Sequence, residues 1–293
     1  MTATDNPDAG NAPFVSADWL KENIDAPDLV VVDGSYYLAA MNRDAEAEFL
    51  AAHIPGAVRF DIDSIKDFAN PLPHMIPSAE DFASAVSAKG IGDDSRIVVY
   101  DGAGLFSAPR VWWMFTIFGA RNISILEGGF PAWRAVGGSI EEGPARPRQP
   151  ACFTARLDRE AVADLPRIEA ALADPTIQVV DARSAARFRG EAPEPRAGLP
   201  SGHMPGSVNL PHTEVVEDGF LKDPQGIQDA LHRHGIDPTK PVVTSCGSGV
   251  SAAILSLAFM RIGHPPQALF DGSWTEWASR EGAAIGTGDP STR

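Results

Sequence analysis

The sequence predicts an α/β fold made of two tandem units, each a parallel β-sheet flanked by helices. Three observations support this prediction. The chain repeats itself, short β-branched runs alternate with helical stretches in both halves, and a proline-rich segment separates the halves. At 293 residues, the chain is long enough for two domains of ordinary size.

The repeat consists of four landmarks that occur twice in the same order. LVVVD at 29–33 recurs as IQVVD at 177–181, HIPGAV at 53–58 as HMPGSV at 203–208, IVVYD at 97–101 as PVVTS at 241–245, and GGFPAW at 128–133 as GSWTEW at 272–277. The offsets are 177 − 29 = 148, 203 − 53 = 150, 241 − 97 = 144 and 272 − 128 = 144 residues. Offsets this similar indicate a tandem duplication.

Within each unit, the order of strands and helices is typical of βα units around a parallel sheet. The expected strands are residues 30–33, 58–60, 97–100 and 123–126 in the first unit, and 179–181, 208–210, 242–244 and 268–270 in the second. Helices are expected over 79–89 and 108–118, and Gly119 and Gly263 fit helix stops.

The boundary between the units is expected at residues 141–150, EEGPARPRQP, a Pro-rich and charged stretch without apolar periodicity. We therefore expect a first domain over 12–140, an interdomain linker over 141–158 and a second domain over 159–293. Residues 1–11 form an acidic stretch without an apolar run, and we expect a flexible N-terminus there.

Composition excludes several classes of function. With 24 Lys and Arg against 39 Asp and Glu, the formal net charge is −15, which repels a phosphate backbone, so no nucleic acid partner is expected. The most apolar segments, 111–120 and 252–260, are too short to cross a bilayer. The N-terminus has the features of neither a secretory signal nor a transit peptide. We expect a cytoplasmic protein with no membrane association.

The chemically most informative segment surrounds Cys246. A buried strand runs directly into this cysteine, Gly247 and Gly249 flank Ser248, and an apolar helix begins near Ser251. Such a strand–loop–helix arrangement directs successive backbone N–H groups toward one point, assisted by the helix N-terminus. It favours the ionised thiol, and the two glycines permit the tight curvature.

The alternative for a lone cysteine is a small buried hydrophobe at a strand end. For Cys246 the following Gly-Ser-Gly favours a functional role. Cys152 lies beside the linker without such a loop, and for it we expect the small buried hydrophobe. A disulfide between the two is possible, but nothing in the pattern requires one, and so few cysteines suit a reducing compartment.

The tandem units, the paired His-x-Pro-Gly motifs and the cysteine loop resemble the rhodanese superfamily over nearly the whole chain. The loop CGSGVS at 246–251 is similar to that of 3-mercaptopyruvate sulfurtransferases. Thiosulfate-specific rhodaneses typically carry CRKGVT there, with two cations facing a dianionic donor. One departure is Ser251, where the family pattern has threonine. It retains the hydroxyl.

The resemblance implies an enzyme that moves sulfur from 3-mercaptopyruvate through a persulfide on Cys246, releasing pyruvate. The acceptor would be a thiol, such as thioredoxin or a small dithiol, or cyanide. Gly247, Gly249, Val250 and Ser251 would complete the binding loop. No cofactor is implied.

His74 lies in the proline-rich loop 70–77, which fixes its position. The residues alone favour a surface histidine at a turn. The resemblance implies instead that Ser248, His74 and Asp63 form a proton relay beside the cysteine. Asp61, two residues from Asp63, is the other candidate for the carboxylate.

Arginines gather in a Gly- and Pro-containing loop at positions 183, 187, 189 and 196. They could simply pair with Glu191 and Glu194 in solvent. The resemblance implies that Arg187 and Arg196 hold the carboxylate and the carbonyl oxygen of the donor, for which bidentate arginine is well suited.

The matching loop of the first unit lacks a cysteine. On the offset of 144 residues, Asp101 matches Ser245, one place before the nucleophile. A carboxylate cannot carry sulfur, so we expect the first unit to be catalytically silent and to supply a wall of the cleft.

Three rival functions share some of these features. A Cys-x5-Arg phosphatase needs an arginine where Ala252 stands, so phosphate would lack its clamp. A thiosulfate sulfurtransferase and a non-catalytic sulfur-binding or scaffolding protein remain as alternatives. The sequence has no Cys/His cluster with metal-ligand spacing and no P-loop or dinucleotide signature. We therefore expect neither a metal nor a cofactor.

Overall fold

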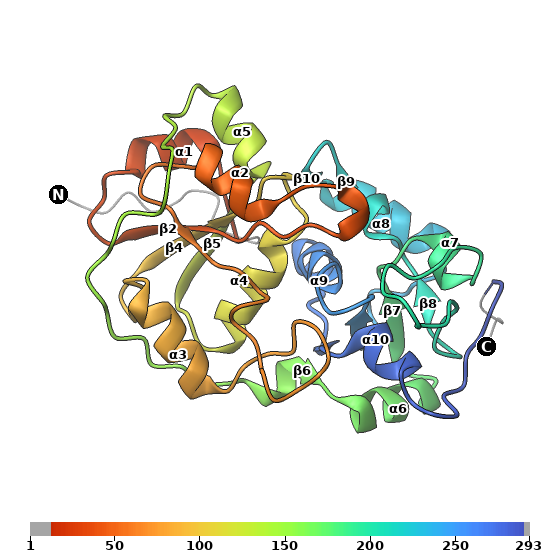
Figure 1. Ribbon diagram of the computed structural model, residues 1–293. Helices are drawn as coiled ribbons and strands as arrows, with labels where there is room; N and C mark the ends of the chain where they lie inside the picture. Colours follow the sequence, from red (N-terminus) through yellow and green to blue (C-terminus); the bar gives the residue numbers. More distant parts are fainter. Residues whose placement is uncertain (1–12, 290–293) are drawn as a thin grey trace.

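The computed structural model describes residues 13–289, which form two five-stranded parallel sheets (Figure 1). The first sheet has the order β1 (Phe14–Val15), β5 (Asn122–Leu126), β4 (Arg96–Tyr100), β2 (Leu29–Asp33), β3 (Val58–Arg59). The second has the matching order β6 (Val162–Ala163), β12 (Ala268–Phe270), β11 (Val242–Ser245), β7 (Gln178–Asp181), β8 (Val208–Asn209). A short antiparallel hairpin, β9 (Val216–Glu217) and β10 (Phe220–Leu221), projects from the second unit.

Helices flank the sheets in both units. The first unit contains α1 (Ala17–Asn23), α2 (Ala45–Ala51), α3 (Ala79–Ala88), α4 (Ala108–Ile117) and α5 (Gly129–Ala135). The second contains α6 (Leu165–Ala173), α7 (Ala185–Phe188), α8 (Pro224–Arg233), α9 (Ala252–Arg261) and α10 (Ser273–Ala278). Side-chain oxygens of Ser or Asp cap the N-termini of α1, α2, α3, α6 and α8. Over residues 13–289, none of these helices has the length and apolarity to span a membrane.

The predicted α/β fold and its duplication are confirmed. All eight expected strands and both expected helices are present, with ends that differ by at most one residue. Gly119 and Gly263 adopt left-handed φ angles of +94° and +81° beyond the ends of α4 and α9. The edge strands β1 and β6 were not predicted, because two residues are too few to show an alternating pattern.

Strand pairing corrects the register of the repeat at the functional loop. The last paired residues are Asp33 with Tyr100 in the first sheet and Asp181 with Ser245 in the second. Tyr100 therefore corresponds to Ser245, and Asp101 corresponds to Cys246. The match of Asp101 with Ser245 was wrong by one residue. The loop of the first unit, 101–107, is one residue longer than its counterpart, 246–251, and the shared offset of 144 concealed this difference.

The two units pack together through α4 and α9, which lie side by side at the centre of the molecule (Figure 1). One hydrophobic cluster contains Val111 and Phe115 of α4 together with Ile254 and Leu255 of α9. Because α4 follows the Asp101 loop and α9 follows the Cys246 loop, this packing brings the two loops toward a common interface.

The histidines of the two His-x-Pro-Gly motifs have the same environment in both units. His53 stacks on Phe49 with ring centroids 4.0 Å apart, and His203 stacks on Phe188 at 4.1 Å. Each Nδ1 also lies within 3.0 Å of the backbone carbonyl oxygen of that phenylalanine. Both are buried. Since only one unit has the cysteine, this shared environment indicates a role in the fold.

The segment expected as a linker, 141–158, runs along the first unit. Glu141 forms a β-bridge with His53, the Ala151 N–H donates to the carbonyl of Ser87, and the Asp158 N–H donates to that of Ile117. A charged, Pro-rich composition is therefore compatible here with a segment held by backbone hydrogen bonds. The flexible N-terminus expected over 1–11 lies outside the described residues.

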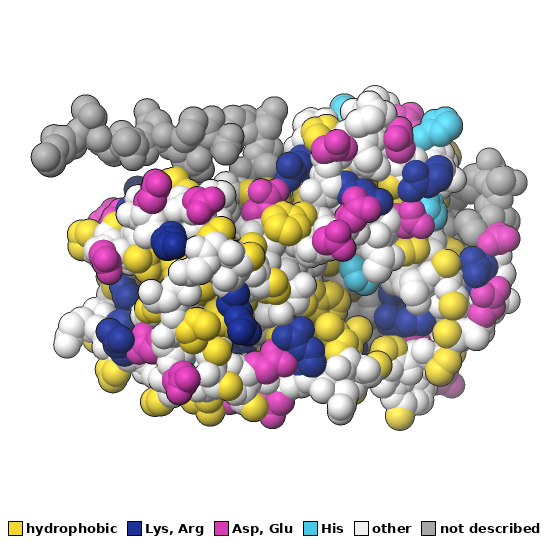
Figure 2. All heavy atoms as spheres, turned by 90° about the horizontal axis from the view of Figure 1, so that it is seen from above, with side chains coloured by type: hydrophobic (Ala, Val, Ile, Leu, Met, Phe, Trp, Pro, Cys, Tyr) yellow, Lys and Arg dark blue, Asp and Glu magenta, His cyan; other side chains and the backbone are white. Residues whose placement is uncertain are grey.

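The surface shown in Figure 2 carries acidic and basic side chains interspersed with one another. On this face the lysines and arginines do not gather into a continuous basic stripe.

Candidate active site

Cys246 lies directly after the carboxyl end of β11, the edge of a parallel sheet at which α/β proteins place their sites. Its side chain is only 2% exposed. The loop 246–251 then leads into α9 at Ala252, close to the expected helix start. Cys152 is exposed, so the expectation of a buried residue was wrong for it, because the segment beside the linker runs along the surface of the first unit. Both cysteines are free thiols, so the possible disulfide is not formed.

The N-terminal end of α10 orients the peptide groups of the loop. The Trp274 N–H donates to the Cys246 carbonyl oxygen at 3.0 Å, and Thr275 donates its N–H and its hydroxyl to that of Gly247, at 3.0 and 2.7 Å. In a trans peptide the N–H points opposite to the C=O, so the N–H groups of Gly247 and Ser248 point away from α10. Among residues 13–289, no acceptor is found for the loop N–H groups of Gly247, Ser248, Val250 and Ser251.

The matching loop of the first unit shows what such N–H groups bind. The carboxylate of Asp101 is fully buried. It accepts four hydrogen bonds of 2.8 Å from the backbone N–H groups of Ala103, Phe106, Ser107 and Ala108. In the corrected register, Asp101 stands at the position of Cys246. The same type of loop therefore cages an anion in one unit and presents unpaired donors behind a cysteine in the other.

This cage gives a stability prediction for the silent unit. Replacing Asp101 with alanine leaves four backbone donors unpaired in a buried loop, and we expect a loss of about 2–4 kcal/mol in the free energy of unfolding. Urea unfolding of both proteins measures the loss. Asp93→Ala is the control, because it removes two hydrogen bonds from Thr154 to a carboxylate at the surface. It should lower the free energy of unfolding clearly less. Equal stability of Asp101→Ala and wild type would contradict the cage.

Ser273 fixes the start of the Cys246 loop, although the sequence did not predict it. Its hydroxyl accepts the N–H groups of Cys246 and Gly249, each at 3.1 Å, and donates to the carbonyl of Phe270 at 2.8 Å. Its φ of +50° is strained for serine, and the first unit has Gly129 there with φ +56°. The signal that could have revealed it is a serine at a position where the repeat has glycine.

His74 reaches the site from the first unit, on the loop between β3 and α3. It is buried, with Nδ1 3.1 Å from Oδ1 of Asp63 and Nε2 3.0 Å from Nη2 of Arg196. A guanidinium can only donate, so Nε2 must accept, and the ring proton resides on Nδ1, facing Asp63.

The surroundings of His74 set its charge. Burial lowers the pKa of His74 from its ordinary 6.5, the positive charges of Arg110 and Arg196 act in the same direction, and Asp63 opposes them. The imidazole is therefore neutral at pH 7. In turn, His74 holds the pKa of Asp63 below its usual value.

The third member of the expected relay does not join this pair. Ser248 is 5% exposed, and its hydroxyl has no hydrogen-bond partner among residues 13–289, while Nε2 of His74 faces Arg196 instead. Of the two candidate aspartates, Asp63 contacts the histidine. Asp61 accepts the N–H of Asp63 at 3.0 Å and so shapes the turn that presents it.

Arg187, on α7, lies directly beside the cysteine loop. A β-carbon added to Gly247 would lie 2.9 Å from Nη2 of Arg187. The guanidinium also contacts Glu194, with Nη2 2.5 Å from Oε2 and Nε 3.2 Å from Oε1. In the part of the chain that the structure describes, its Nη1 has no hydrogen-bond partner, which leaves it available to a ligand.

The four arginines of this segment have different surroundings. Arg183 is completely buried between Asp181 and Glu194 and lies over the ring of Trp274, so it serves the fold. Arg189 pairs with Glu191 at the surface. Of the four, Arg187 lies beside Gly247 and Arg196 lies beside His74, and their binding of the donor stays a prediction. Pairing with Glu191 and Glu194, the alternative from the sequence, occurs for three of the four arginines.

Tyr36 is a further neighbour of the site that the sequence did not indicate. Its ring meets His74 edge-on, with centroids 4.9 Å apart. Burial raises the pKa of Tyr36, and the charges of Arg196, Asp63 and Cys246 act on the phenol as well. The hydroxyl therefore lies among groups from both units. No motif marks Tyr36, which simply follows the end of β2.

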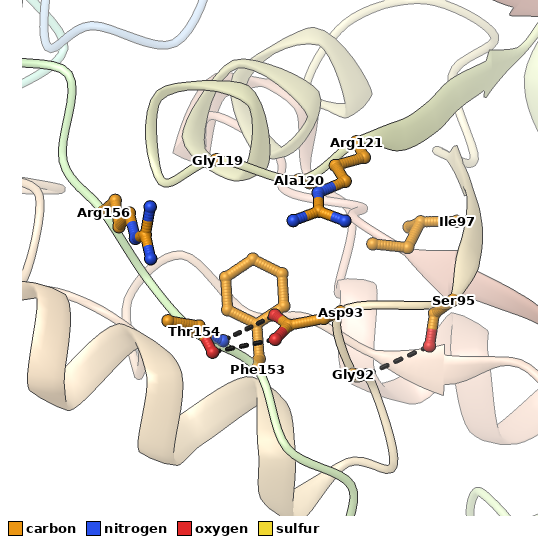
Figure 3. A pocket seen from close by; sticks show the side chains of 10 residues that line it. All are labelled: Gly92, Asp93, Ser95, Ile97, Gly119, Ala120, Arg121, Phe153, Thr154 and Arg156. Carbon is orange, nitrogen blue, oxygen red and sulfur yellow. Dashed lines mark hydrogen bonds between the residues drawn. The ribbon is translucent and has the colours of Figure 1, made fainter.

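A separate hollow of about 200 Å³ lies where residues 153–156 pack against the first unit (Figure 3). Arg121 and Arg156 approach it from its two sides, and Asp93 is held by the N–H and hydroxyl of Thr154. The lining residues include no cysteine or histidine, so this hollow does not share the chemistry of the Cys246 region.

Comparison with known proteins gives the chain a context. A profile of the rhodanese-like domain matches residues 16–136 and 165–280. The 3-mercaptopyruvate sulfurtransferase of Escherichia coli K12 is 42% identical over 268 residues, covering 91% of this chain and 95% of that protein. The thiosulfate sulfurtransferase of Bos taurus is 42% identical over 275 residues, covering 91% and 92%.

Among solved structures, the crystal structure of SseA from Escherichia coli, described as a 3-mercaptopyruvate sulfotransferase, has a TM-score of 0.82 to this chain. It is 40% identical, and the match covers 90% of this chain and 99% of that one. Relatives at equal identity thus carry names that refer to different sulfur donors. Overall similarity alone does not select between those donors.

Proposed function

The chain belongs to the rhodanese family, and from that membership we propose that it is a sulfurtransferase that takes sulfur from 3-mercaptopyruvate and carries it on Cys246 as a persulfide. The observation that carries the proposal is the pair of matched loops. One holds the Asp101 carboxylate by four backbone N–H groups, and the other leaves such groups unpaired after Cys246. A thiolate, and then a persulfide anion, would take the place of the carboxylate.

The choice of donor rests on the charges beside the loop. Gly247 and Ser248 stand where thiosulfate-specific relatives carry two cations. The space next to Gly247 is occupied by the guanidinium of Arg187. Positive charge therefore comes from Arg187 and Arg196, outside the loop. Their planar forks match the carboxylate and keto oxygen of an α-keto acid.

Binding of the donor must rearrange the free site, because the thiol is nearly inaccessible. We propose that the donor carboxylate draws Arg196 away from His74. That exchange exposes Nε2 of His74, which can then meet the hydroxyl of Ser248. The relay of Asp63, His74 and Ser248 would thus form only when the donor is bound, in keeping with catalytic hydrogen bonds that tighten in the complex.

In the first half-reaction, the Cys246 thiolate attacks the sulfur of 3-mercaptopyruvate. A new S–S bond forms, the C–S bond of the donor breaks, and its electron pair leaves on carbon as the enolate of pyruvate. The proton of the donor thiol passes through Ser248 and His74 to that carbon. The products are the Cys246 persulfide anion and pyruvate, and the loop N–H groups stabilise the charge on sulfur.

In the second half-reaction, an acceptor thiolate attacks the outer sulfur of the persulfide and leaves with it, which restores the Cys246 thiolate. Cyanide would leave as thiocyanate in the same way. We propose thioredoxin or a small dithiol as the acceptor. Because pyruvate departs before the acceptor reacts, steady-state kinetics should follow a ping-pong pattern.

The pH dependence of the reaction tests the role assigned to His74. The imidazole must be neutral to accept a proton, and its pKa is lowered. We therefore expect kcat/KM for 3-mercaptopyruvate to hold through neutral pH and to fall on an acid limb below the ordinary histidine value of about 6.5. Asp63 stabilises the protonated ring, so Asp63→Asn should move that limb to still lower pH. A limb that stays in place, or moves upward, would contradict the assignment.

A paired donor assay tests the proposed function. We expect kcat/KM for 3-mercaptopyruvate to exceed that for thiosulfate. Introducing Gly247→Arg and Ser248→Lys together should narrow the difference, because two cations would then face a dianionic donor. A higher value for thiosulfate in the wild-type protein would identify the chain as a thiosulfate sulfurtransferase.

A further inference from the structure

We propose that the buried ion pair of Arg110 and Asp271 is a positioning device, by which the first unit sets His74 against the cysteine loop of the second. The inference rests on the sulfurtransferase function proposed above. It gives the unit without a nucleophile an active part in the reaction. Neither residue contacts the thiol or belongs to the Ser248, His74 and Asp63 relay.

Arg110 connects three separate segments from its place in the first turn of α4. Its side chain is completely buried. Its Nη2 donates to the carbonyl oxygen of His74 and to Oδ1 of Asp271, both at 2.6 Å, and its Nη1 lies 3.4 Å from the carbonyl oxygen of Gly249. One guanidinium thus contacts the backbone of the histidine loop and the backbone of the cysteine loop.

Asp271 completes the connection from the second unit. While Oδ1 binds Arg110, Oδ2 accepts the N–H of Ile76 at 2.8 Å. The histidine loop is therefore held by the ion pair at two points, the carbonyl of His74 and the amide of Ile76. Asp271 also lies two residues before Ser273, whose hydroxyl holds the cysteine loop. The two loops consequently share one anchor.

The backbone of His74 explains why such an anchor is needed. Its φ of +60° lies in the left-handed region, which a non-glycine residue adopts at a cost of about 1–3 kcal/mol and keeps only when its surroundings hold it.

Gly249 of the cysteine loop fits closely against the ion pair of Arg110 and Asp271. A β-carbon there would lie 2.8 Å from Nη1 of Arg110 and 2.9 Å from the carbonyl oxygen of Asp271.

A purely structural role would not require these contacts. Replacing a buried ion pair with apolar residues of similar size is often neutral or stabilising, so adhesion between the units does not by itself call for a charged pair.

The charge of Arg110 also acts on the histidine of the proposed proton relay. The charged or titratable groups around His74 are Asp63, Arg196, Tyr36 and Arg110, and Arg110 acts to lower the pKa of the imidazole.

The test uses the double variant Arg110→Met with Asp271→Leu, which removes the pair without leaving a lone buried charge. Arg110 touches no donor, so we expect kcat with 3-mercaptopyruvate to fall about 10²-fold with little change in KM. We also expect the acid limb to move to higher pH, because of the two charges removed it is that of Arg110 that acts on His74 and lowers its pKa. Thermal denaturation establishes that the variant is folded.

Two further variants complete the design. Arg110→Lys keeps the charge, but one ammonium group cannot reach the carbonyl oxygens of His74 and Gly249 and the carboxylate of Asp271 together. We therefore expect kcat to stay reduced. The acid limb should lie closer to its wild-type position than in the double variant. Arg261→Met is the matched control. It removes another arginine that joins the units, through Glu127, away from His74, and it should leave kcat and the pH profile unchanged.

The outcomes separate this inference from the function it rests on. If wild-type protein gains no sulfur on Cys246 when incubated with 3-mercaptopyruvate, the proposed function fails. If it does gain sulfur, and the folded double variant matches its kcat and its acid limb, the positioning role is refuted. If the double variant does not fold, Arg110→Lys decides instead. A kcat of this variant equal to that of the wild-type protein would refute the positioning role.

Discussion

Replacement of Cys246 with serine is expected to lower sulfur transfer from 3-mercaptopyruvate by at least about 10³-fold, the largest effect of any single substitution in this chain. A serine hydroxyl is not ionised near neutral pH and cannot hold a sulfane sulfur. The surrounding N–H groups, fixed by α10 and Ser273, would remain in place. The measurement is steady-state pyruvate release, together with mass spectrometry of the peptide that contains residue 246.

The matched control is Cys152→Ser. Cys152 is the other cysteine of the chain, it is exposed, and it lies on the segment between the units, so its loss should leave both turnover and persulfide formation unchanged. Wild-type protein incubated with donor but without acceptor should gain one sulfur atom on Cys246. An unmodified peptide together with undiminished turnover of Cys246→Ser would overturn the cysteine mechanism, whereas a wild-type protein without turnover would favour the scaffolding alternative.

The first unit keeps the loop of the repeat but carries a carboxylate in place of the cysteine. Asp101 stands where Cys246 stands in the other unit, and its own charge satisfies the donors that would otherwise bind a substrate or an intermediate. The expectation that this loop carries no sulfur agrees with the geometry, although the expected alignment was one residue out. What we propose that the first unit supplies to the chemistry comes from other segments, with His74 and Asp63 on one loop and Arg110 on α4.

The fold was predictable because its signals are local and repeated. Buried parallel strands such as β2 and β4 read as continuous β-branched runs, and each signal occurs twice. The cysteine loop was predictable for a similar reason, since Cys246, Gly247 and Gly249 are contiguous. The resemblance to a known family then indicated Arg187, Arg196 and His74, which no local pattern would have singled out.

The remaining features depend on packing between segments far apart in the sequence. Arg110 meets Asp271 across the two units, a separation of 271 − 110 = 161 residues, and no periodicity reports such a contact. Its one signal is a charged residue in an otherwise apolar helix. The contact of Arg196 with His74 likewise involves both units. This contact occupies Nε2 of His74, the atom that the proposed relay would offer to Ser248.

The second large effect concerns the arginines that we propose read the donor. Each makes charge-assisted hydrogen bonds worth about 1.5–3 kcal/mol, so Arg187→Gln and Arg196→Gln should each reduce kcat/KM for 3-mercaptopyruvate by roughly 10- to 10²-fold. Arg187→Lys keeps the charge but loses the planar fork, and most of the loss should persist. Arg189→Gln is the control. Its side chain pairs with Glu191 at the surface, and its replacement should leave kcat/KM unchanged.

The pH profiles distinguish the two arginines. Arg196 lies 3.0 Å from Nε2 of His74 and acts to lower the pKa of that ring, so Arg196→Gln should also move the acid limb to higher pH. Arg187 contacts Glu194 and Gly247 rather than the histidine, so its replacement should weaken donor binding without moving the limb. If both variants shifted the limb equally, or if neither lost more activity than Arg189→Gln, donor recognition by this pair would be excluded. In that case the loop N–H groups alone would have to bind the carboxylate.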